Sequence, residues 1–377
     1  MFGQHYSVNG EKYTNYFSAL RRSQELNSFA ELIFPKWHID KLQSVDVPLA
    51  LSKSTSHWID KKLNYITQNY KKLRLSYSGG TDCHTILIHG WNKKIYFDKI
   101  FMFMAGSIYD ESNQDHLPAI NFLDQNKDKF GDFELFCASA KDFECWFDKD
   151  ICFKTPAFEF MFRPHWRSVS LNKYFSETDV DCNISGHDKP QLFRQGKHYY
   201  LVFKSSLDQN SYLHNAINFF NDGHIPELAV NQAYNAMEFY KKYMPDVHGY
   251  IDEKPVPSKL KKSWNFALGR APVVDDILYE GTTIGKGVTP VSWRHRESMK
   301  WIASLGRTDI IEAWHDRRKE LIDEFKDVKW GIEIKTIEDP LDETKRIDIP
   351  LPIDRVGCVF RLDAEKMVQV PVETLNM

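Results

Sequence analysis

Closely spaced pairs of cysteines are missing from this sequence. Its 377 residues include six cysteines, and no two of them have the C-x-x-C spacing of a zinc or iron–sulfur site. The six are Cys83, Cys137, Cys145, Cys152, Cys182 and Cys358. We therefore expect no thiolate metal centre, and we expect a reduced, intracellular protein.

A long apolar run is also missing, so no segment is predicted to span a bilayer. The opening residues, Met1-Phe2-Gly3-Gln4-His5, lack the charged and apolar regions of a signal peptide. The resulting prediction is a cytoplasmic protein with no membrane partner.

Neither sign of charge is in large excess, because 49 Lys and Arg oppose 52 Asp and Glu to give a net charge of −3. So small a charge provides no overall attraction to nucleic acid, although a local basic patch stays open as an alternative. The length suits about two or three domains.

One glycine-rich segment, Ser78-Gly79-Gly80-Thr81-Asp82-Cys83, lies between a predicted strand at residues 73–77 and a predicted helix at residues 82–91. Glycines let a ligand approach the main chain closely, and the N–H groups at a helix start attract anions. The sequence therefore predicts a phosphate-binding loop. A Gly-Gly turn that only connects the two elements is the alternative.

This loop is not of the Walker type, because no Gly-Lys-Ser/Thr ending follows its glycines. It resembles the PP-loop, Ser-Gly-Gly-x-Asp-Ser, of the N-type ATP pyrophosphatases, which include the synthetase domains of asparagine synthetase and GMP synthetase. The resemblance covers roughly residues 73–204. It implies that the loop holds the β and γ phosphates of ATP with Mg²⁺, and that ATP is cut between its α and β phosphates.

The last position of the loop departs from the family, which usually has serine where this chain has Cys83. A thiol is a weaker hydrogen-bond donor, so one contact to phosphate is lost if the cysteine is a tolerated replacement. A thiol at a helix start can also be reactive, which keeps a sulfur-transferring enzyme open. A domain that binds nucleotide without turning it over is the third interpretation.

Strands predicted at residues 100–104 and 133–137 flank a helical stretch, so two successive βαβ units favour a parallel sheet. We therefore predict a doubly wound, Rossmann-like α/β fold. The resemblance implies that main-chain atoms of Met104, Ala105 and Gly106, at the end of the second strand, bind the adenine.

A second charged segment, Gly186-His187-Asp188-Lys189, follows a strand predicted at residues 180–185. The carboxyl ends of parallel strands meet at one edge of a sheet, so this segment is expected to face the glycine loop. Related synthetases carry a glycine-and-acid motif there. By this resemblance Gly186 contacts the nucleotide, Asp82 and Asp188 hold Mg²⁺, and Lys189 neutralises the departing pyrophosphate. A solvated turn with an Asp–Lys pair is the alternative.

Four regions are predicted along the chain. They are a helical N-terminal extension at residues 1–70, the PP-loop domain at 71–206, a mostly helical substrate or partner region at 207–330, and a β-hairpin tail at 331–377. A hairpin that turns at Gln195-Gly196 is expected near the end of the second region. The last two regions together make an α+β C-terminal part.

The predicted function is an ATP-dependent ligase that adenylates a carbonyl or carboxylate oxygen, which an amine or ammonia then attacks. Asp82, Asp188 and Lys189 are the predicted catalytic residues, and ATP and Mg²⁺ the cofactors. Position 2 is Phe2, where a glutamine amidotransferase of the asparagine synthetase kind has cysteine, so a separate amine or ammonia donor is expected. The acceptor is a small molecule or a nucleotide, with a nucleic-acid base left open.

Overall fold

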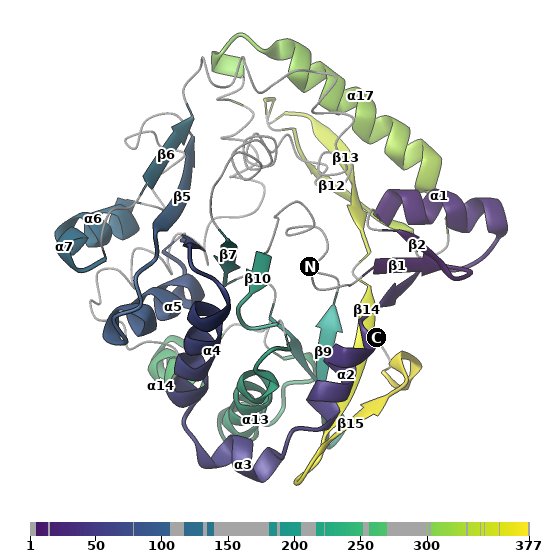
Figure 1. Cartoon of the computed structure of the whole chain (residues 1–377). Helices are drawn as coiled ribbons and strands as arrows, with labels where there is room; N and C mark the ends of the chain where they lie inside the picture. The colour runs from purple at the N-terminus through teal and green to yellow at the C-terminus, as the bar shows by residue number, and fades with distance from the viewer. Residues whose placement is uncertain are drawn as a thin grey trace.

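The computed structural model describes residues 5–13, 16–77, 79–105, 117–130, 134–138, 181–186, 189–204, 216–221, 223–251, 256–269, 300, 303–328, 331–339, 341–342, 344–353 and 355–375. Within these residues a parallel sheet lies on one side of the molecule, and several antiparallel sheets lie on another side. The long helix α13 is near both (Figure 1).

The parallel sheet has five strands in the order β10-β7-β4-β5-β6, and all four neighbouring pairs are parallel. Its strands are β4 (Leu73–Ser76), β5 (Lys99–Ala105), β6 (Glu134–Ala138), β7 (Cys182–Ser185) and β10 (Ala216–Asn218). The chain adds strands on one side of β4 and then returns to add β7 and β10 on the other side. The strand order therefore reverses between β4 and β7, which makes this the switch point of the sheet.

Helices cover the parallel sheet. They are α4 (Thr55–Asn69) before β4, α5 (Thr81–Asn92) between β4 and β5, and α6 (Leu117–Gln125) with α7 (Lys127–Phe130) between β5 and β6. Residues 73–75 of β4 and all of β7 are buried, so side chains on both faces of the central strands are covered. Side chains of α4, α5 and α6 join those of the sheet in one apolar core. The predicted α/β class with a parallel sheet is confirmed.

The first 70 residues are not only helical, because they include a small antiparallel sheet in the order β2-β1-β3. Its strands are β1 (His5–Val8), β2 (Glu11–Tyr13) and β3 (Glu31–Ile33), and the helices are α1 (Tyr16–Leu26), α2 (Lys36–Gln43), α3 (Val47–Ser52) and α4. These strands are too short for a periodic apolar pattern. The Asn9-Gly10 turn, with φ of 49° and 87°, was the local signal for the hairpin.

A second five-stranded sheet is antiparallel throughout, in the order β11-β8-β9-β14-β15. Its strands are β8 (Gln191–Gln195), β9 (His198–Lys204), β11 (Gly249–Tyr250), β14 (Val356–Leu362) and β15 (Met367–Val370). The β8–β9 hairpin turns at Gly196, with φ of 60°, as predicted. A separate hairpin pairs β12 (Ile332–Glu338) with β13 (Arg346–Pro352), so hairpins are present in the predicted tail.

The predicted domain boundary at residue 206 does not separate the two five-stranded sheets. The β8–β9 hairpin precedes that boundary but pairs with β14 of the tail, whereas β10 follows it and completes the parallel sheet. Other helices in the described part of the chain are α13 (Pro226–Tyr243), α14 (Lys261–Ala267) and α17 (Thr308–Phe325), with 3₁₀ turns at Ser258–Leu260 and Val372–Thr374. Among the helices that the structure describes, none has both the length and the apolar character needed to cross a membrane.

A buried asparagine fastens α13 to the start of α4. The amide nitrogen of Asn231 donates to Ala50 O at 2.9 Å and to Lys53 O at 3.0 Å, while its oxygen accepts from Thr55 Oγ1 at 2.6 Å and from Asn235 Nδ2 at 2.9 Å. Its side chain is 1% exposed, so water cannot replace these bonds.

We predict that Asn231→Ala lowers the free energy of unfolding by about 2–3 kcal/mol, because several buried partners lose a hydrogen bond at once. Asn235→Ala is the matched control and should cost less, since Asn235 is only partly buried. Urea denaturation of both variants measures the difference. Equal losses would contradict the assigned role of Asn231.

Candidate functional site

The glycine loop connects β4 to α5 with the backbone geometry that its sequence predicts. Gly79 has φ of +69°, a conformation that residues with a side chain rarely adopt. Gly80 is extended and stands immediately before the first helical residue, Thr81. Gly79 is buried, whereas Gly80, Thr81 and Asp82 are partly exposed, so this end of α5 is open to solvent. Ser78 lies outside the described residues.

A buried hydrogen bond lies beneath this loop. The Tyr77 hydroxyl and His84 Nδ1 are 2.9 Å apart, and the His84 ring packs edge-on against Phe122 with 4.9 Å between ring centres. Burial lowers the pKa of His84 to about 4 and raises the pKa of Tyr77, so both groups are neutral near pH 7. Tyr77 N also donates to Phe101 O at 2.8 Å. The end of β4 and the first turn of α5 are thereby held together.

The segment after β7 touches the first turn of α5 directly. A Cβ placed on Gly186 would lie 3.0 Å from Cys83 N and 3.1 Å from Cys83 Sγ. No other residue type fits there without moving the helix, so glycine permits the contact. The structure therefore brings together Gly186 and the glycine loop, as the positions of their strands predicted.

Lys189 and Asp82 form an ion pair across the same junction. Their side chains are 26% and 28% exposed, so the pair is partly shielded from water. The sequence assigned Asp82 to Mg²⁺ and Lys189 to pyrophosphate, and the structure shows that these two groups are also partners of each other.

The structure describes the other predicted ligand-binding residues only in part. Met104 and Ala105 are the last residues of β5, at the carboxyl edge of the sheet, and the structure describes their main chain. Gly106 and Asp188 lie outside the described residues, as does His187. Within the described part of the chain, no three His, Cys, Asp or Glu side chains are grouped closely enough to hold a metal ion.

The described thiols do not resemble activated nucleophiles. Cys83 is 3% exposed, and Cys182 is fully buried at the start of β7. Burial raises the pKa of the Cys182 thiol to about 12, which disfavours the reactive thiolate at neutral pH. Cys358 is buried in the antiparallel sheet, and its pKa is raised for the same reason.

No family model matches the chain, and no curated protein sequence matches it. Its chemistry must therefore be inferred from the residues that the fold brings together.

We predict that stability falls between pH 6.5 and 4 in part because of His84. Its folded pKa of about 4 is below the ordinary 6.5, so in this window the unfolded chain binds a proton that the folded chain does not. His84→Gln should flatten the dependence of unfolding free energy on pH by up to about 1.4 kcal/mol per pH unit. His38 and His224 are shifted in the same direction and act alike in both proteins, so the comparison isolates His84. Equal slopes would contradict this assignment.

Proposed function

We propose that this chain is an ATP pyrophosphatase of the PP-loop kind, which forms AMP and pyrophosphate while adenylating a carbonyl or carboxylate oxygen. The observation that carries the proposal is the meeting of Gly186 and Lys189 with the first turn of α5 at the switch point of a parallel sheet. In open α/β sheets, ligands bind outside the carboxyl ends of the strands at this point.

The glycine loop supplies the phosphate contacts in this proposal. The first N–H groups of a helix have no partner within the helix, and the helix dipole adds partial positive charge there. Gly79 and Gly80 let the phosphates approach the main chain without meeting a Cβ. The β and γ phosphates would occupy this end of α5, which leaves the α phosphate to react.

The Lys189–Asp82 pair supplies the charged groups that this proposal needs for the metal and the pyrophosphate. Mg²⁺ carries two positive charges and prefers carboxylate oxygens, so Mg²⁺ with ATP would draw Asp82 away from Lys189. The released ammonium would then neutralise charge on the departing pyrophosphate. Asp188 is proposed as the second carboxylate for the metal, and the main chain of Met104 and Ala105 at the end of β5, together with Gly106, as the adenine contact. No covalent nucleophile of the protein is needed.

The acceptor is proposed to be a small molecule or a nucleotide, and the attacking amine or ammonia to come from a separate donor. The sulfur-transferring alternative is weaker, because burial disfavours a thiolate at Cys182. The third interpretation is a protein that binds nucleotide without turning it over. Such a protein would use the same phosphate site and would differ only in leaving the bond between the α and β phosphates intact.

We predict that Gly79→Ala weakens ATP binding by roughly 5- to 30-fold, because an alanine at φ of +69° costs about 1–2 kcal/mol and displaces the loop. Gly196→Ala is the matched control, since Gly196 has a similar φ of +60° in the distant β8–β9 turn and a Cβ there meets no atom within 4 Å. Titration calorimetry with Mg²⁺ and ATP compares the two. Equal affinities would place the nucleotide elsewhere.

Turnover is tested by following radiolabelled ATP in the presence of cellular small-molecule and nucleic-acid fractions. We expect AMP and pyrophosphate as products, a roughly 100-fold or greater loss of rate in Lys189→Ala, and little change in the surface control Lys197→Ala. Cys83→Ser should keep the activity, and loss of turnover in that variant would favour the sulfur chemistry. ADP and phosphate as products would contradict the proposal.

A further inference from the structure

A third chain segment reaches the site, in the turn that follows β10. Phe219 N donates to Ser185 O at 2.8 Å, which ties this turn to the end of β7 immediately before Gly186. Asn221 N donates to Asn218 O at 2.9 Å and tightens the same turn. The turn is therefore positioned by the parallel sheet itself, beside the two segments already described.

Two adjacent aromatic rings in this turn each face a lysine. Phe219 and Phe220 pack edge to face, with 5.1 Å between ring centres and an angle of 72°. The ammonium of Lys189 lies 5.2 Å from the centre of the Phe220 ring, and that of Lys62 lies 5.8 Å from the centre of the Phe219 ring. Both distances allow a cation–π interaction.

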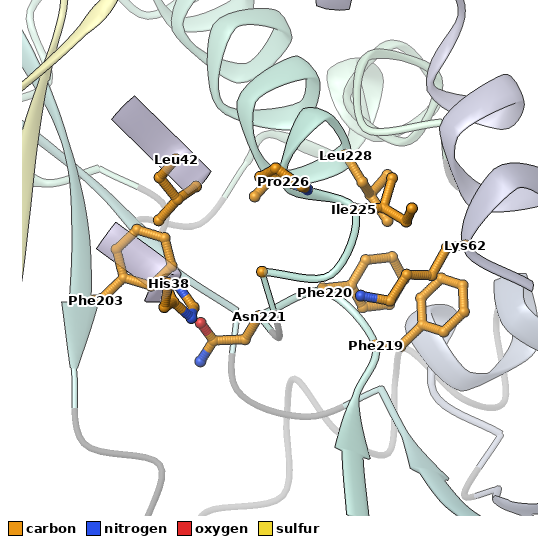
Figure 2. Close-up of a pocket in the computed structure, with 12 residues that line it drawn as sticks. His38, Leu42, Lys62, Phe203, Phe219, Phe220, Asn221, Ile225, Pro226 and Leu228 are labelled. Carbon is orange, nitrogen blue, oxygen red and sulfur yellow. The ribbon is translucent and has the colours of Figure 1, made fainter. Parts of the chain in front are cut away.

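The two rings also line a small cavity (Figure 2). Phe219 and Phe220 line it together with Lys62, His38 and Asn221, and Lys189 is not part of its wall. The cavity has room for about one water molecule, too little for a nucleotide. Phe219 is fully buried and Phe220 is 3% exposed, so the pair is a fixed part of the core.

We infer that Phe220 is a positioning residue whose ring holds the ammonium of Lys189 beside the glycine loop. An aromatic ring attracts a cation without cancelling its charge, whereas Asp82 neutralises it. If Asp82 were to bind Mg²⁺, the ring would still hold Lys189 beside the start of α5. The catalytic part of this inference rests on the proposed function, but the contact with Lys189 does not.

The contact is tested first, on the full chain without nucleotide. Lysines are reductively methylated with ¹³C, and the Lys189 signal is assigned by its loss in Lys189→Arg. Because a ring current shifts groups above an aromatic face, we expect an upfield Lys189 signal that returns to the ordinary range in Phe220→Leu and stays shifted in Phe220→Tyr. Phe219→Leu is the matched control and should leave the Lys189 signal in place. An unchanged signal in Phe220→Leu would overturn the inference.

The consequence is tested next with inorganic pyrophosphate and Mg²⁺ as the probe. Phe220→Leu should weaken binding by roughly 2- to 30-fold, the range of one cation–π interaction, and Phe220→Tyr should restore it. Phe220→Met, which keeps bulk but has no ring, repeats the test if the leucine variant does not fold. Unchanged pyrophosphate affinity after loss of the ring-current shift would also overturn the inference. Absence of ATP turnover in the unaltered protein would count against the proposed function, while the Lys189 signal would still decide the contact.

Discussion

The close contact between Gly186 and the first turn of α5 is the constraint on which the rest of the site depends. A side chain at this position would crowd the helix, because a Cβ would lie 3.0 Å from Cys83 N. Gly186 thus lies against the start of α5, and Lys189, three residues further along the chain, pairs with Asp82. Adjacent parallel pairing of β4 and β7 places these distant parts of the sequence side by side.

Much of the parallel sheet could be predicted because its signals are local. The strand β5 is a short, mostly apolar run, as buried parallel strands are, and the glycines that follow β4 and β7 mark where those two strands end. The strand order could not be predicted in this way, since it depends on which side of β4 each later strand pairs. The structure adds that β7 lies on the opposite side of β4 from β5, so the strand order reverses at β4, the kind of position at which ligands bind in open α/β sheets.

Other features arise only from tertiary contacts. The pairing of Lys189 with Asp82, the bond between Tyr77 and His84, and the Phe220 ring near Lys189 join residues that share no periodic pattern. Polar side chains are also buried where no local pattern indicates it, with His84 at 5% exposure and Lys62 at 1%. Sequence periodicity shows which face of a helix or strand is buried, but it does not identify the residue that this face contacts on a neighbouring element.

The most direct measurement is a crystal structure with Mg²⁺ and an ATP analogue whose α and β phosphates are joined by a methylene group. We expect the β and γ phosphates on the main chain of Gly79 and Gly80, Asp82 on the metal, and Lys189 separated from Asp82 but still over Phe220. A nucleotide bound elsewhere, or an intact Lys189–Asp82 pair beneath bound phosphates, would show that this loop is not the phosphate site we propose.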